Sequence, residues 1–312
     1  MSYQGKQIDK DFEASGLSRL TTVDWQNENH QRSIAASLVQ GVYALKNARQ
    51  KNQQVCQAWW ASFDFQLTDK LTDDSDSSIF GAVYEFIPKP KNNHSIEAPT
   101  YVIAFRGTMI RKETWARDMK LNIKIMKNKL HRSSCIEKAI QAVKSKASVK
   151  GATIWLAGHS MGSAIAMLAG KDMAKTGKFL ASYLFNPPFV AYPMKSGILV
   201  ATTFMITAAA TVFVRDNQER QHSENVFNDL SKWAPKLYLH PSDPICSGYI
   251  LYFKLLEKMQ RYGVGFVGRL AAPNSLRACV TTSHTPKRNS HDLSQWFTDD
   301  SVNSHPKMYR HN

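Results

Sequence analysis

The sequence predicts an α/β protein, with a mostly parallel central sheet that carries helices on both of its faces. From about residue 100 onward, short apolar runs alternate with segments whose apolar residues recur at helical spacing. One of these runs leads directly into a glycine-flanked serine and then into a helix of small and apolar residues. The hydrophobic fraction of 43% in 312 residues is enough for a sizeable core and argues against a disordered chain.

The same patterns predict the individual elements. Residues 33–49 carry the first clear helical pattern, and Ser33 is the candidate N-cap of that helix. Strands are expected at 81–87, 101–105, 153–157, 180–185 and 236–240, the last clear one. Helices are expected at 135–146, 161–174 and 249–262, with a helix-like segment at 293–297.

We expect a single domain at 31–300, between a polar N-terminal segment at 1–30 and a polar tail at 301–312. A lid region is expected at about 190–230, because the segment 197–214 in it contains no charged residue. Its alanines and threonines make this segment only weakly apolar, and it is at the short edge of a membrane span. We therefore interpret it as a buried or lid helix, with a membrane span as the alternative.

The formal net charge of +15 would suit nucleic acid or an anionic membrane surface as a partner. The basic residues are scattered, however, and no nucleic-acid-binding motif is present, so no nucleic-acid partner is predicted. The densest basic run, at 117–132, alternates with apolar residues. Such alternation is typical of a solvated face, and peripheral contact with an anionic membrane surface is the alternative interpretation.

Cysteine usage and the N-terminus indicate a cytoplasmic protein. The four cysteines form no C-x-x-C pair, and the first residues lack the apolar segment of a signal peptide, so free thiols are expected. HExxH, EF-hand and P-loop motifs are absent, and the G-x-G-x-x-G at 263–268 follows a predicted helix instead of a strand. We therefore predict neither a metal nor a cofactor.

The strongest chemical signal is the pentapeptide GHSMG, which fits G-x-S-x-G between a predicted strand and a predicted helix. This is the nucleophile elbow of the α/β-hydrolase fold, a sharp turn that lifts the serine hydroxyl above the sheet. Ser160 is the candidate nucleophile, and Gly158 and Gly162 are the small residues that so tight a turn requires. The backbone N–H of Met161 can point at a developing oxyanion. His159 is interpreted as a packing residue and not as a base.

A serine nucleophile needs a base and an acid that orients the base, and in this fold the chain order is serine, acid, histidine. Asp243 follows the strand at 236–240 and is the candidate acid, with capping of the next helix as its alternative role. The later histidines are His284, His291, His305 and His311. The last two lie in the polar tail, and position alone does not separate the first two.

A second oxyanion donor is expected from the loop that follows the strand at 101–105. Gly107 permits an unusual turn there, and Thr108 can donate through its N–H or its hydroxyl.

The segments AFRGT and LAGHSMG and the Pro-x-Asp-Pro sequence around Asp243 together resemble the class 3, fungal triacylglycerol lipase-like family. The segments IFGAVYEF, AGKDMAKTGKF, LFNPPFV and TTVDWQNENHQRSIAASLVQGVYALKNARQ are similar to a plant clade of it that is labelled "GDSL esterase/lipase". No Gly-Asp-Ser-Leu motif is present here. The resemblance extends over 16–297. This chain departs from the clade in two ways: its RDMKLNIKI stretch is less acidic, and its loops around 193–222 and 280–290 are shorter.

The resemblance implies hydrolysis of ester-type lipids with Ser160, Asp243 and His291 as the triad and with Thr108 and Met161 as the oxyanion hole. It selects His291 because SHDLSQWF matches the family's histidine near a Gln-Trp pair. We therefore predict a serine hydrolase that cleaves hydrophobic acyl esters through an acyl-enzyme. The alternatives are an acyltransferase that uses the same acyl-enzyme and a non-catalytic lipase-like signalling or binding scaffold.

Overall fold

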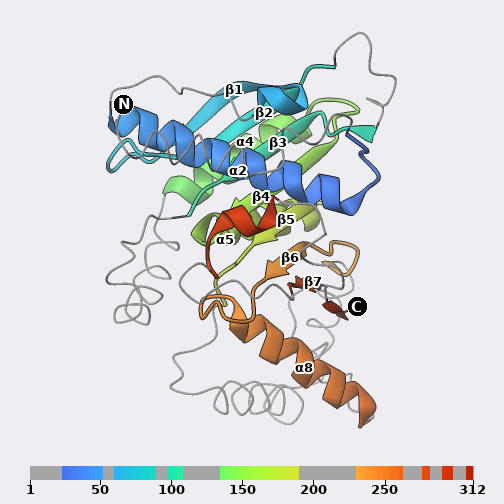
Figure 1. Cartoon of the computed structure of the whole chain (residues 1–312). Coiled ribbons are helices and arrows are strands. Elements are labelled where there is room, and N and C mark those ends of the chain that lie inside the picture. The colour runs from blue at the N-terminus through green and yellow to red at the C-terminus, as the bar shows by residue number, and fades with distance from the viewer. Residues whose placement is uncertain are drawn as a thin grey trace.

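A computed structural model describes residues 23–51, 60–88, 97–107, 134–189, 230–262, 276–281 and 290–297, together with the backbone of 307–311. In these ranges the strands form one eight-stranded sheet whose spatial order follows the chain order, β1 to β8 (Figure 1). The strands are β1 (Phe65–Thr72), β2 (Ile79–Phe86), β3 (Tyr101–Phe105), β4 (Ile154–His159), β5 (Ala181–Phe185), β6 (Lys236–Leu239), β7 (Leu276–Val280) and β8 (Lys307–His311). Neighbours from β3 to β7 are parallel, whereas β1–β2, β2–β3 and β7–β8 pair antiparallel. The predicted mostly parallel sheet is therefore confirmed.

Helices cover both faces of this sheet, as predicted. The described helices are α2 (Glu28–Gln50), α4 (Ser134–Ala147), α5 (Met161–Ala174) and α8 (Ser247–Arg261), with the short 3-10 helices η1 (Ala61–Phe63) and η4 (Leu293–Trp296). Figure 1 shows α2 crossing one face of the sheet, with α4 and α5 behind the sheet. Helix α2 packs on β2 to β5 and on η4, whereas α5 packs on β3 to β5 and on α4.

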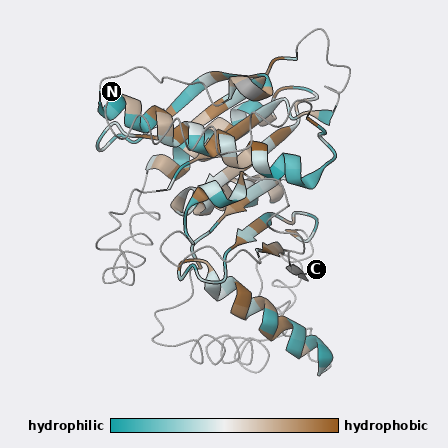
Figure 2. Ribbon diagram, viewed as in Figure 1, coloured by the Kyte–Doolittle hydropathy of each residue, from teal (hydrophilic) through white to brown (hydrophobic). Residues whose placement is uncertain are grey.

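Helix α2 starts earlier than the sequence pattern predicts. Its N-cap is Asn27, whose side chain accepts a hydrogen bond from the backbone N–H of Asn29. The prediction of Ser33 as the cap is wrong, because Ser33 lies buried inside the helix. The polar residues before Ser33 form the first turn of α2. Figure 2 shows that both ends of α2 are hydrophilic and that its middle part is more apolar. That middle part packs on the sheet.

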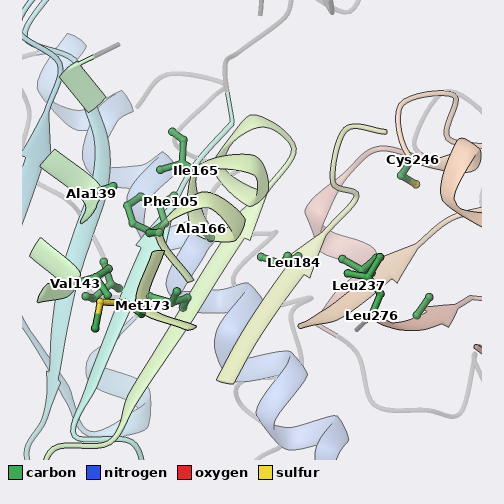
Figure 3. Close-up of a cluster of buried hydrophobic side chains, with 14 of the residues drawn as sticks. Phe105, Ala139, Val143, Ile165, Ala166, Met173, Leu184, Leu237, Cys246 and Leu276 are labelled. Carbon is green, nitrogen blue, oxygen red and sulfur yellow. The ribbon is translucent and has the colours of Figure 1, made fainter. Parts of the chain in front are cut away.

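Alternate residues of the central strands face opposite sides of the sheet, so the sheet separates two cores. In β3, Val102 and Ala104 lie in the core under α2, whereas Ile103 and Phe105 lie in the core under α4 and α5. Phe105 shares this buried cluster with side chains of α4 and α5, namely Ala139, Val143, Ile165, Ala166 and Met173 (Figure 3). The central strands are thus fixed from both sides, and their ends hold the loops of the candidate site.

Strands β1, β7 and β8 are not predicted by the sequence pattern. They lie at or near the edges of the sheet and carry polar residues, as in FQLTDKLT and KMYRH, so no continuous apolar run marks them. Strand β8 falls in the segment 301–312 that we predicted as a polar tail. Except for Leu230, the predicted lid region at 190–230 lies outside the described residues. Among the residues that are described, no helix has the length and apolar character to cross a membrane.

Candidate active site

Ser160 occupies a sharp turn between β4 and α5. Its backbone angles of φ 54° and ψ −122° lie outside the regions that non-glycine residues favour, a strain worth about 1–3 kcal/mol. Its backbone N–H donates to the carbonyl of Phe185, 2.9 Å away, which ties the turn to β5. A side-chain carbon on Gly158 would lie 2.5 Å from the carbonyl oxygen of Gly162. Likewise, a side chain on Gly162 would meet the carbonyl of Phe105 at 2.3 Å, so both positions exclude a larger residue.

Asp243 and His291 form a hydrogen-bonded pair, with 2.8 Å between Oδ2 of the carboxylate and Nδ1 of the imidazole. Asp243 follows β6 and is fully buried. Its other oxygen accepts the backbone N–H of Ile245 at 3.0 Å, and α8 begins only at Ser247 with no side-chain cap. The alternative role as a helix cap is therefore wrong. The predicted acid and one of the predicted histidines are in contact.

Electrostatics keep the Asp243 carboxylate ionised. Burial raises its pKa, but hydrogen bonding and charge attraction from His291 and hydrogen bonds from Asn186 and Ile245 outweigh burial and lower the pKa below its ordinary value. An ionised acceptor at Nδ1 favours the tautomer that carries its proton there. The Nε2 atom of His291 is then left with a lone pair that can accept a proton.

Asn186 is a site residue that sequence reasoning missed. It follows β5 and donates through Nδ2 to Oδ2 of Asp243 at 2.5 Å and to the carbonyl of Ser290 at 3.0 Å. Its Oδ1 accepts the indole N–H of Trp296 at 2.7 Å, which fixes the orientation of the amide. The only sequence signal is a polar residue that directly follows a predicted buried strand.

The end of β3 lies against Ser160. A side-chain carbon on Gly107 would be 2.8 Å from Cβ of Ser160. The buried guanidinium of Arg106 donates to the carbonyl of Ile79 and to that of Gly107, both at 2.6 Å, and so holds this turn on β2. Thr108, predicted as an oxyanion donor, lies outside the described residues. Met161, the other predicted donor, is the buried first residue of α5 and directly follows Ser160.

His159 is buried and hydrogen-bonded at both ring nitrogens. Its Nδ1 lies 2.8 Å from the hydroxyl of Tyr43, and its Nε2 lies 2.8 Å from the backbone carbonyl of His291. Burial and the nearby His291 lower the pKa of His159 to about 3, although the hydrogen bond to the His291 carbonyl and the negative charge of Asp243 act in the opposite direction. The ring is therefore neutral at physiological pH, and it links the elbow directly to the His291 loop.

This neutral histidine makes the stability of the fold depend on pH. Its pKa is lower in the folded than in the unfolded chain, so the unfolded chain binds one more proton between about pH 6.5 and pH 3. The contribution to stability is complete above that window and is lost as the pH falls through it. We expect the difference in unfolding free energy between wild type and His159→Gln to change by about 1 kcal/mol per pH unit below pH 6. Urea titrations at pH 7.5, 6 and 5 measure it, and parallel pH dependences would contradict the buried neutral state.

Strands β4 and β6 thus bring Ser160, Met161 and Asp243 to the end of the sheet where the carboxyl ends of the parallel strands meet. His291 reaches this end through its hydrogen bond to Asp243. His284 and Thr108 lie outside the described residues, and of His311 only the backbone is described. A buried carboxylate, an imidazole and a strained serine turn in this arrangement can support nucleophilic chemistry.

The order of the strands, the parallel pairing of the central strands and the sharp turn at Ser160 together define the α/β-hydrolase fold. The family model described as "Lipase (class 3)" matches residues 102–192. A protein of Arabidopsis thaliana named "GDSL esterase/lipase" is 35% identical over 333 residues, which cover 93% of this chain and 95% of the relative. The chain therefore belongs to the class 3 lipase family and is a carboxylic ester hydrolase.

Two solved structures are also similar to the chain, each at 14% identity. One is a lipase from Rhizopus microsporus var. chinensis, with a TM-score of 0.41 over 70% of this chain and 68% of the lipase. The other is the lipase of Rhizomucor miehei with its propeptide, with a TM-score of 0.38 over 70% of this chain and 61% of that chain.

Proposed function

We propose that this protein hydrolyses hydrophobic acyl esters through an acyl-enzyme, with Ser160 as nucleophile, His291 as general base and acid, and Asp243 as the group that orients His291. The strongest support is the 2.8 Å hydrogen bond between His291 and the buried, ionised Asp243. The carbonyl of His291 accepts from His159, the residue that precedes Ser160, so the pair is tied to the serine turn. A serine with an imidazole base that a carboxylate orients is the arrangement used for nucleophilic attack on an acyl carbonyl.

In the proposed reaction, Oγ of Ser160 attacks the ester carbonyl while Nε2 of His291 takes the hydroxyl proton. The tetrahedral intermediate collapses, the ester C–O bond breaks, and the alcohol leaves with the proton that His291 returns. Water then attacks the acyl-enzyme by the same route and releases the acid. The backbone N–H of Met161 and a donor of Thr108 stabilise the oxyanion, and the loss of one such donor typically lowers kcat by about 10²–10³-fold.

The substrate class follows from the family. The matching family is a family of lipases, and the relative from Arabidopsis thaliana is named an esterase/lipase. We therefore propose that the acyl chain is hydrophobic and that kcat/KM for p-nitrophenyl esters rises with acyl length from acetate to octanoate. Each added methylene that is buried contributes about 0.8 kcal/mol of binding. A rate that falls steadily with acyl length would contradict a hydrophobic acyl site.

Labelling with a fluorophosphonate tests the nucleophile directly. An activated serine attacks phosphorus, fluoride leaves, and the intact mass rises by one phosphonyl group per chain. We expect one adduct on wild type, none on Ser160→Ala and strongly slowed labelling of His291→Ala, both with and without detergent. Ser163, which is buried at the start of α5 and donates to the carbonyls of Gly158 and Phe185, provides the matched control Ser163→Ala, which keeps the label. Absence of an adduct on folded wild type would contradict the proposed function and favour a non-catalytic scaffold.

A further inference from the structure

A chain of hydrogen bonds joins the end of β3 to the loop of His291, and it runs through two residues with no part in the proposed proton transfers. The backbone N–H of Gly107 donates to the hydroxyl oxygen of Tyr43 on α2, 2.8 Å away. That hydroxyl lies 2.8 Å from Nδ1 of His159, and Nε2 of His159 lies 2.8 Å from the carbonyl oxygen of His291. The rings of His159 and His291 are also in contact, with 4.8 Å between their centroids.

The direction of every bond in this chain is fixed by chemistry. The His291 carbonyl can only accept, so Nε2 of His159 must carry the proton. Burial keeps the pKa of His159 at about 3, so the ring is neutral and its Nδ1 must be an acceptor. Burial also raises the pKa of Tyr43 to about 12, so the phenol keeps its proton and donates it to Nδ1. The phenol oxygen then accepts the Gly107 N–H with a remaining lone pair.

We propose that Tyr43 and neutral His159 are positioning residues. They fix the position of the Gly107 loop, which leads into the proposed oxyanion hole, relative to the backbone of the catalytic histidine, His291. This inference rests on the proposed function. Neither residue exchanges a proton with substrate. All three hydrogen bonds are part-buried, so a substitution that removes one partner leaves a polar group with limited access to water.

The location of the two residues explains why such a link is useful. Gly107 follows β3, His159 ends β4, and His291 lies just before η4. The sheet itself sets the relative position of the first two, but the loop that carries His291 is not part of a strand. Tyr43 lies on α2, which packs across one face of the sheet and also on η4. Of these elements, the sheet connects only β3 and β4, whereas the hydrogen bonds also connect these two strands to the loop that carries His291.

Substitutions that separate hydrogen bonding from packing test this role. His159→Gln keeps one donor and one acceptor, whereas His159→Leu fills the space without either. We expect kcat to fall roughly tenfold or more in His159→Leu and in Tyr43→Phe, with KM within about twofold, and to stay within about threefold of wild type in His159→Gln. The double variant Tyr43→Phe with His159→Leu is expected to lose little more than either single variant, because both interrupt the same chain.

Tyr84→Phe is the matched control. Its hydroxyl also donates inside the core, to the carbonyl of Leu38 on α2 at 3.1 Å, and not to a site loop. We expect it to lose stability without loss of kcat. Equal kcat in wild type and folded His159→Leu, or an equal loss in Tyr84→Phe, would overturn the positioning role. The fluorophosphonate label on wild type separates the two failures: a labelled wild type with unaffected variants overturns this inference alone, whereas an unlabelled wild type overturns the proposed function beneath it.

Discussion

Asp243→Asn is expected to lower kcat for ester hydrolysis about 10⁴-fold while the fold is retained. The reason is local. Oδ1 of Asp243 accepts the backbone N–H of Ile245, and Oδ2 accepts from His291 and from Asn186. An asparagine must keep its oxygen toward Ile245, and its NH2 group then faces two donors.

His291 can avoid this clash only by moving its proton to Nε2, where it can no longer accept the serine proton. The Asn186 amide cannot turn to help, because Trp296 donates to its oxygen. Steady-state kinetics on a p-nitrophenyl ester measure the effect, and Asp69→Asn, an exposed carboxamide substitution on β1, serves as the control. A value of kcat above one tenth of wild type in Asp243→Asn would contradict the role of Asp243.

Gly107→Ala is expected to lower kcat about 10²-fold, the usual effect of a displacement of about 1 Å in a catalytic group. The new methyl group would lie 2.8 Å from Cβ of Ser160, 2.9 Å from the hydroxyl of Tyr43 and 3.1 Å from the carbonyl of His159. None of these neighbours is the free end of a flexible chain, so the β3 loop must move away from the nucleophile.

The control for this substitution is Gly151→Asn. Gly151 has a positive φ of 75°, which asparagine tolerates, and a side chain there would meet nothing within 4 Å. We expect wild-type kinetics and a small change in melting temperature for Gly151→Asn, against a large loss of kcat in Gly107→Ala. Wild-type rates in Gly107→Ala would show that the β3 loop does not position the reacting groups.

The predictable part of the site is the part that lies next to a regular element. Ser160 follows a predicted strand and precedes a predicted helix, and Asp243 follows the last clear predicted strand, at 236–240. In a parallel sheet the positions that directly follow the strands all lie at the same end of the sheet. The predicted strand pattern alone therefore places Ser160 and Asp243 at the same end. The choice between His284 and His291 was not available from periodicity, because the histidine loop has no strand or helix pattern of its own. The resemblance to class 3 lipases supplied it.

Tyr43 and Asn186 were not predictable for a different reason. In the sequence, Tyr43 looks like an ordinary residue of an amphipathic helix. Its hydroxyl contacts His159, which lies 116 positions away in the chain. Asn186 reads as a loop residue, and its partner Asp243 lies 57 positions away. Such contacts depend on how helices and loops pack on the sheet, and no local pattern of apolar residues contains that information. The edge strands were missed because their polar residues mask the two-residue alternation.

The strictly sequential order of the strands has a consequence for how the enzyme is made. Because each strand is added beside the one synthesised just before it, a growing chain can build the sheet from β1 onward without leaving a gap. The serine turn and the Gly107 loop are then in place long before translation reaches His291. During synthesis, the proposed nucleophile Ser160 therefore exists before the proposed base His291. Under the proposed mechanism, a chain that ends before His291 lacks its general base, so we expect it not to hydrolyse esters.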